Sequence, residues 1–203
     1  MGDLTLQQVV LRIGAVLLIA SVHGFAVAAV ACAIGDPGPR YDNRLRLSPL
    51  QHVDPIGGLL MVLFTIGWIR PVAVDPDRLR PGRAGLAAVV IGASCATLGL
   101  AMVLRLMRPI VLNMLPDTAA ATFFIFVEIV AQLCIAFTVF NLLPLPMLTG
   151  VHLLIAIMPR KRNVLRRMQP YFVVLLALLI AVGVAARLLA PAEAVIARVM
   201  LGD

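Results

Sequence analysis

Three histidines are the residues in this chain best suited to chemistry. They are His23, His52 and His152, and no other histidine is present. A neutral imidazole can bind zinc or act as a general base near neutral pH. Catalytic zinc sites commonly use three protein ligands and keep water in the fourth position. Three histidines therefore suffice for a metal site only if the fold brings all of them together.

Glu128 is an acidic residue in the middle of a long apolar stretch. An ionisable side chain inside a membrane is costly, so a buried acid there is a candidate for function. The carboxylate can equally pair with Arg105 or Arg12, or stay protonated against a neighbouring helix. Both interpretations remain open at the level of sequence.

Four stretches of the chain combine Gly, Pro, His and Asp residues within otherwise apolar sequence. In chain order they are residues 21–28 (SVHGFAVA), 47–57 (LSPLQHVDPIG), 67–75 (GWIRPVAVD) and 140–150 (FNLLPLPMLTG). Together they resemble the site-2 protease family of intramembrane zinc metalloproteases, whose motifs in the same order are HExxH, NPxxHxDPxG, GWAKPVPVN and NLLPxPPLDG. The resemblance covers most of the chain.

The departures from these motifs fall on the positions that would carry the chemistry. In HExxH, two histidines on one helix face hold zinc, and the Glu takes a proton from the bound water. His23 is kept here, but Gly24 replaces the Glu and Val27 replaces the second His. Thr149 stands where the family has the Asp that is its third zinc ligand. The resemblance therefore implies a degenerate site, and we expect no proteolysis.

An alternative metal site would combine His23, His52 and His152. His152 follows Thr149 by three residues and so lies near the same helix face. Alternatively, the three histidines have structural roles only. In that case His52 belongs to the turn of its motif, His152 lies at a helix end, and His23 is a hydrogen-bonded packing residue. A replacement site needs three converging ligands and would still lack an obvious base. The sequence therefore favours no cofactor, with zinc at these histidines as the alternative.

Asn141, Pro144 and Pro146 mark the Pro-rich break in the last motif. An amide side chain at such a break suits backbone groups that a broken membrane helix leaves without partners. In the family that the chain resembles, this Asn lies near the substrate backbone. The resemblance thus implies that these three residues contact a bound peptide or helix.

The composition indicates a membrane protein. Hydrophobic residues make up 62% of the chain and charged residues 13%, whereas soluble domains are about a quarter charged. The apolar runs predict an all-α polytopic fold with about four full transmembrane helices in a single domain, residues 1–203. The predicted spans are residues 6–34, 84–106, 118–143 and 171–189.

Two further apolar segments are too short for a comfortable crossing. Residues 55–69 and 147–158 are expected to be re-entrant or half-spanning, and such segments are tolerated where they line protein or a cavity. Residues 40–54 alternate polar and apolar side chains, which is compatible with a small β-hairpin at the membrane interface.

The net charge of +7 comes mostly from arginines between the apolar runs. This distribution follows the positive-inside rule, so we expect no nucleic-acid partner. If both short apolar segments fold back instead of crossing, the basic loops at residues 40–46, 70–83 and 160–167 share the cytoplasmic face. The Arg- and Ala-rich composition favours a bacterial inner membrane.

Three functions are compatible with these features. The leading hypothesis is an inactive relative, kept as a scaffold, assembly factor or accessory subunit, which binds transmembrane helices of other integral membrane proteins within the lipid bilayer. Small residues on the first helix and on residues 84–106 suit such contacts. The second hypothesis is a metal-binding protein with the three-histidine site. Transport is suggested only by Glu128 and the short segments.

Overall fold

The computed structural model describes residues 5–201, and most of this part of the chain is helical. Four helical segments are long and apolar enough to cross a membrane, which agrees with the predicted all-α polytopic fold. These segments are α1 (Leu6–Ala33), α5 with α6 (Ala84–Met114), α7 (Asp117–Asn141), and the 3₁₀ turn η1 with α9 (Pro159–Ala181). The remaining helices are α2 (Gly38–Tyr41), α3 (Pro49–His52), α4 (Pro55–Phe64), α8 (Val151–Ile157) and α10 (Val184–Leu201).

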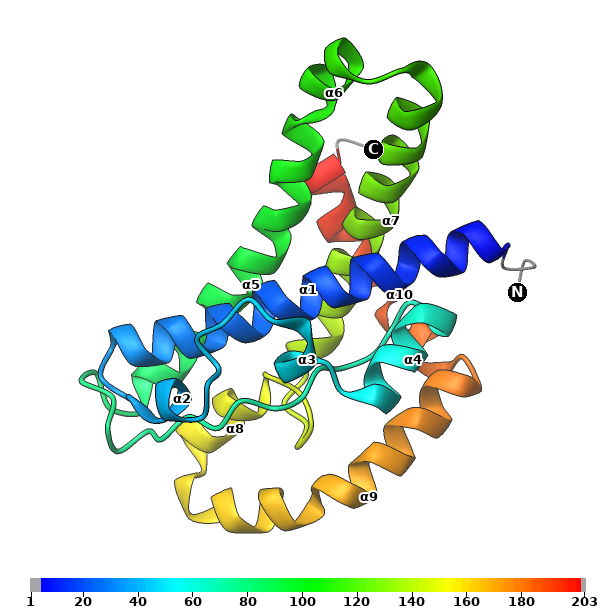
Figure 1. Cartoon of the computed structure of the whole chain (residues 1–203). Coiled ribbons are helices and arrows are strands. Elements are labelled where there is room, and N and C mark those ends of the chain that lie inside the picture. The colour runs from blue at the N-terminus through cyan, green and yellow to red at the C-terminus, as the bar shows by residue number, and fades with distance from the viewer. Residues whose placement is uncertain (1–4, 202–203) are drawn as a thin grey trace.

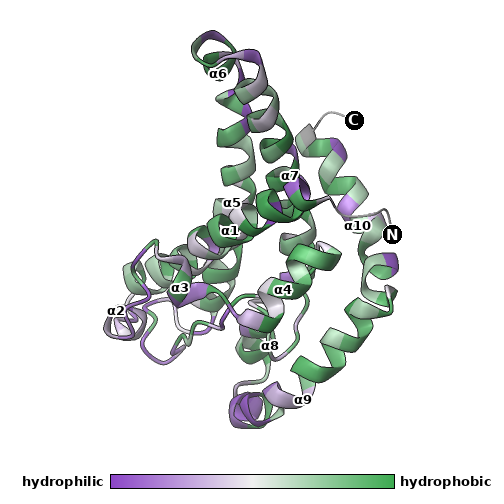
Figure 2. Ribbon diagram, turned by 45° about the vertical axis from the view of Figure 1, so that its right-hand side comes forward, coloured by the Kyte–Doolittle hydropathy of each residue, from purple (hydrophilic) through white to green (hydrophobic). Residues whose placement is uncertain are grey.

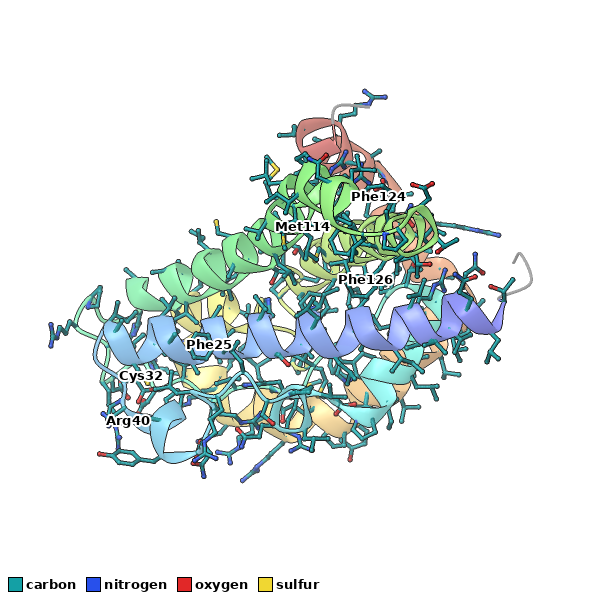
Figure 3. All side chains as sticks on the ribbon, turned by 45° about the horizontal axis from the view of Figure 1, so that its top comes forward. Phe25, Cys32, Arg40, Met114, Phe124 and Phe126 are labelled. Carbon is teal, nitrogen blue, oxygen red and sulfur yellow. The ribbon has the colours of Figure 1, made fainter. Side chains whose placement is uncertain are left out.

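Helix α1 is the central element and begins at a capping box. The Thr5 hydroxyl accepts from the Gln8 backbone N–H, and the Gln8 side chain accepts from the Thr5 N–H. Its small residues allow close neighbours: a Cβ at Gly14 would lie 3.5 Å from the ring of Phe126 on α7. Figure 3 labels Phe126 where α7 passes over α1. Helices α5 and α7 both pack on α1, and these three helices share a buried apolar cluster with residues of α4.

Helices α5, α6 and α7 form a hairpin that extends away from the rest of the molecule (Figure 1). The segment predicted at residues 84–106 coincides with α5, and the chain continues after a bend into α6 (Arg108–Met114). A proline at the second position of α6 starts the new helix, since its missing N–H needs no partner there. The segment predicted at 118–143 is α7, and it ends two residues earlier.

The last predicted span, residues 171–189, differs from the observed helices. Helix α9 begins at Arg162, includes Pro170, and ends at Ala181, while residues 184–201 form the separate helix α10. The break lies at Gly183, whose φ of 78° is a left-handed conformation that glycine adopts readily. Helix α10 then turns back to pack on α7.

The predicted β-hairpin at residues 40–54 is not formed. This region contains the short helices α2 and α3, and prolines lie in the first turn of each. Its single β-type contact is an isolated antiparallel bridge between Val53 and Ile69. Prolines that fix a helical φ at these starts outweigh the alternation of polar and apolar residues.

The segment predicted at residues 55–69 is a ten-residue helix, α4, followed by extended chain. Asp54 caps α4, because its carboxylate accepts from the N–H groups of Ile56 and Gly57 at 3.1 and 2.9 Å. Arg12 of α1 donates to the Val62 carbonyl at 2.9 Å near the other end of α4. Figure 2 shows hydrophilic residues concentrated in the loops around α2 and α3 and at the start of α9.

Candidate functional site

His23 lies in the middle of α1 and is almost completely buried, with 1% of its surface exposed. Both ring nitrogens have partners: Nδ1 lies 2.8 Å from the Thr97 hydroxyl on α5, and Nε2 lies 2.8 Å from the Thr149 hydroxyl. The ring also meets Phe137 edge to face, with 4.9 Å between centroids. Three segments distant in sequence thus hold one imidazole in place.

The hydrogen bonds define how His23 carries its proton. The Thr97 hydroxyl donates to the Ala93 carbonyl at 2.8 Å, so it can only accept from His23. Nδ1 of His23 is therefore the protonated nitrogen. In a neutral imidazole Nε2 is then an acceptor, and the Thr149 hydroxyl donates to it. The chain of bonds ends in a backbone carbonyl, and every polar group in it is satisfied.

The Thr149 hydroxyl binds Nε2 of His23 on the side where a metal ion bound to this nitrogen would lie. The distance of 2.8 Å between Nε2 and the Thr149 oxygen is that of a direct hydrogen bond. Two ligands that share a tetrahedral zinc ion, at about 2.0–2.1 Å each, would lie roughly 3.3 Å apart. Thr149 stands at the position of the family's third zinc ligand, and its hydrogen bond thus occupies the nitrogen with which His23, at the position of the first ligand, would bind zinc.

Gly24 is covered by a second imidazole. A Cβ built at Gly24 would overlap the His52 ring, so this ring fills the space where a side chain at position 24 would begin. His52 is fully buried, and its Nε2 donates to the Arg46 carbonyl at 2.9 Å. Its Nδ1 has no partner among the described residues. The position that carries the Glu in HExxH is therefore occupied by His52.

A cavity of about 210 Å³ lies beside this closed site. One wall contains Val27, in place of the second HExxH histidine, and Thr149. Residues 71–74 of the GWIRPVAVD motif also line the cavity, and the chain runs extended here between α4 and α5 (Figure 1). Residues of α8 and the first half of α9 complete the lining. Two of the positions that carry zinc ligands in the family motifs, Val27 and Thr149, thus border this cavity.

His152 lines this cavity and not the His23 site. It is 7% exposed, and its Nδ1 has no partner among the described residues. From the other side, Arg162 and Arg166 of α9 reach the cavity. Arg162 crosses to Asp75, 3.1 Å away, and so joins the start of α9 to the extended wall.

The donor set does not fit a zinc ion. In the part of the chain that the structure describes, no three His, Cys, Asp or Glu side chains are grouped so that they could hold a metal. Of the three histidines considered above, His23 has both nitrogens engaged, and His52 uses Nε2 for a backbone carbonyl. His152 contributes to a different surface.

The Pro-rich break separates its three candidate residues. Asn141 is buried, and its amide nitrogen donates to the carbonyls of Phe137 and Gly67 at 3.0 and 3.3 Å. Pro146 lines the cavity, whereas Pro144 is exposed. Asn141 thus fixes the Gly67 end of the extended wall, and Pro146 is the residue of the three that borders the cavity.

Glu128 pairs with neither arginine considered from the sequence. Its carboxylate lies 2.7 Å from Arg108 at the start of α6, and both side chains are partly exposed. Arg12 instead binds the end of α4. Glu128 lies on the α6–α7 hairpin and is absent from the cavity lining, so the structure gives it a local pairing role.

Two important residues were not identified from the sequence. Thr97 orients His23, but a threonine within a transmembrane run rich in small residues carries no distinguishing signal. Asp36 is 1% exposed and accepts from the backbone N–H groups of Gly38 and Asp75 at 2.9 and 2.7 Å. A sequence signal existed for Asp36, since an acid directly after a long apolar helix commonly binds backbone groups.

Two buried histidines make the stability of the protein sensitive to acid. Burial lowers the pKa of His52 and lowers the pKa of His152 to about 4, and neither lies in a helix long enough to cross a membrane. The unfolded chain takes up protons near pH 6.5, before the folded chain does, so stability is present above roughly that pH and is lost as pH falls below it.

We expect the melting temperature in detergent to fall between about pH 7.5 and pH 5. The variant His152→Gln should flatten part of this decline, and an unchanged profile would contradict the assignment.

The chain is similar to a curated protein from Bacillus subtilis (strain 168) named "Putative zinc metalloprotease YwhC". The two are 33% identical over 145 residues, which cover 68% of this chain and 65% of the relative. The chain thus spans a little under two thirds of the length of that relative. The name of this relative, a zinc metalloprotease, agrees with the resemblance to the site-2 protease family that the four motifs indicate.

Two other comparisons gave no match. No family model matches the chain, and no solved structure matches it.

Proposed function

We propose that this site-2-protease-like membrane protein has lost zinc-dependent proteolysis and serves as a scaffold or accessory subunit. In this role it holds a segment of a partner membrane protein in the cavity beside the former active site. The observation that carries the proposal is the direct bond between Thr149 and Nε2 of His23. This bond satisfies the one imidazole that the HExxH motif retains.

The loss of the base supports the same proposal. Metal-assisted hydrolysis needs a group that takes the proton from the attacking water. Gly24 has no side chain, and the His52 ring fills the adjacent space. Val27 offers no ligand atom and forms part of an apolar wall. The base and the second histidine ligand of the motif are thus both absent.

The extended segment 71–74 supports binding of a partner. It borders the cavity, and the backbone N–H groups of Val72, Ala73 and Val74 donate to no acceptor in the described part of the chain. An extended segment with free backbone groups can pair with another extended chain by strand addition. A partner helix that unwinds at its end can therefore bind here.

The proposed location is a bacterial inner membrane. The basic residues at the start of α9, residues 160–167, would then lie on the cytoplasmic side under the positive-inside rule. Arg162 and Arg166 of this basic segment line the cavity, so a partner segment would enter it from the cytoplasmic interface.

The proposal is tested with protein purified gently from membranes and reconstituted with a model single-span segment that ends in an extended apolar tail. A photocrosslinking residue at Ala73, in the cavity wall, is expected to capture the tail intact. The same residue at Ala88, exposed on α5, is the matched control and should not capture it. Elemental analysis should find no stoichiometric zinc.

Two results would overturn the proposed function. One is stoichiometric zinc that disappears in the His23→Ala variant, together with cleavage of the model segment that a chelator blocks. The other is equal crosslinking at Ala73 and Ala88, which would mean that the cavity does not select the tail.

A further inference from the structure

The cavity beside His23 is positively charged on one side. Arg162 and Arg166 lie four residues apart on α9, hence on one helix face, and both line the cavity. His152 faces the same space from α8. No acidic side chain belongs to the cavity lining. A ligand that enters this space therefore meets two guanidinium groups and no carboxylate on the walls.

The two arginines differ in what already binds them. Arg162 pairs with Asp75 at 3.1 Å, and Asp75 also lies 3.4 Å from Arg78. Arg166 makes no ion pair and no side-chain hydrogen bond with any residue from 5 to 201. Its five N–H donors are thus free for an acceptor, and a carboxylate matches a guanidinium with two parallel bonds.

A second buried group in the cavity lining lacks a hydrogen-bond partner. His152 is 93% buried, and its Nδ1 has no partner in the described chain. A buried polar atom without a partner is costly, and a bound group that supplies a hydrogen bond removes that cost. Apolar side chains and the free N–H groups of residues 72–74 form most of the remaining wall.

We propose that the segment bound in this cavity is an extended, mainly apolar peptide that carries one acidic residue, which pairs with Arg166. The inference rests on the proposed function and specifies its partner. The apolar side chains of the peptide lie against the wall formed by Val72, Val74 and Met147. Its backbone pairs with residues 72–74, and its carboxylate reaches α9. A phospholipid headgroup would also satisfy Arg166, but it has no backbone to pair with the extended wall.

The test measures binding of two labelled peptides to the full chain in nanodiscs of neutral lipid. The peptides share one extended apolar sequence and differ only in a central Glu or Gln. We expect the Glu peptide to bind about tenfold more tightly, and to lose this advantage at high salt, because a charge-assisted pair is stronger than a neutral one. The variant Arg166→Gln should remove the preference.

Arg167→Gln is the matched control. Arg167 is the next residue of the same helix, carries the same charge, is also exposed, and does not line the cavity. Both substitutions are at exposed positions, so neither should prevent folding. Arg167→Gln is expected to keep the full preference for the Glu peptide.

Each of the other possible results contradicts one part of the proposal. Equal affinity of the two peptides, with crosslinking from Ala73 retained, would refute the acidic residue and leave the proposed function intact. Failure of both peptides to bind or crosslink would refute the proposed function itself. If anionic lipid in the nanodiscs displaces the Glu peptide, and Arg166→Gln removes binding of that lipid, the occupant is a headgroup and the peptide assignment is wrong.

Discussion

Substitution of Gly24 by Glu, which restores the base position of HExxH, is expected to destabilise the protein without restoring activity. The new Cβ would overlap the His52 ring, and this ring is held by its bond to the Arg46 carbonyl. Overpacking of a buried site typically costs about 1–3 kcal/mol. The melting temperature in detergent measures the loss, and Gly99→Ala on α5 is the control, since a Cβ at Gly99 meets nothing within 4 Å.

A double substitution separates this overlap from a general effect of the buried charge. Combining Gly24→Glu with His52→Ala removes the ring that fills the space. We expect the double variant to be more stable than the sum of the two single losses predicts, by about 0.5–3 kcal/mol, as for residues in direct contact. Strict additivity would show that the His52 ring does not restrict position 24.

Gly67→Ala, a substitution near the cavity wall, is expected to destabilise the protein more than Gly24→Glu does. A Cβ at Gly67 would collide with the carbonyl oxygen of Gly57 and lie 3.0 Å from Cβ of Met61. Gly57 lies in the first turn of α4 and is fixed by the Asp54 cap, so the backbone cannot move without loss of hydrogen bonds. We expect a loss of about 2–4 kcal/mol, in the upper range of single substitutions.

Two measurements on this variant should change together. The melting temperature should fall, and crosslinking from Ala73 should weaken, because Gly67 begins the segment that leads to the extended wall. Gly99→Ala should leave both unchanged or raise stability slightly, as Gly to Ala within a helix does. Full stability of Gly67→Ala would contradict the close backbone contact between the two motifs.

Most of the architecture follows from local features of the sequence. The apolar runs gave the positions of α1, α5 and α7 to within about two residues, because length and hydropathy decide them. The last span was predicted at residues 171–189, whereas α9 begins at Arg162, continues through Pro170 and ends just before Gly183. The hairpin at residues 40–54 failed because alternation over a short polar stretch is weaker than proline at a helix start.

The motifs indicate where the site lies. Whether its side chains are free or already hydrogen-bonded depends on contacts between distant segments. The sequence shows that Gly24 and Thr149 replace chemical groups. It does not show that His52 covers Gly24, or that Thr97 and Thr149 bind the two nitrogens of His23. These contacts join residues up to 126 positions apart. The spacing of residues along the chain does not predict contacts over so large a separation.

The ion pair between Arg162 and Asp75 has a kinetic consequence. It connects the first half of α9 to the extended wall across the cavity, and its side chains are 41% and 33% exposed. Exposed pairs of this kind contribute about 0–1 kcal/mol, close to thermal energy. The second half of α9 is held more firmly, through Leu176 and Ile180 in a buried cluster. The start of α9 can therefore separate from the wall often and briefly, which would let a segment enter the cavity from the cytoplasmic interface without unfolding the protein.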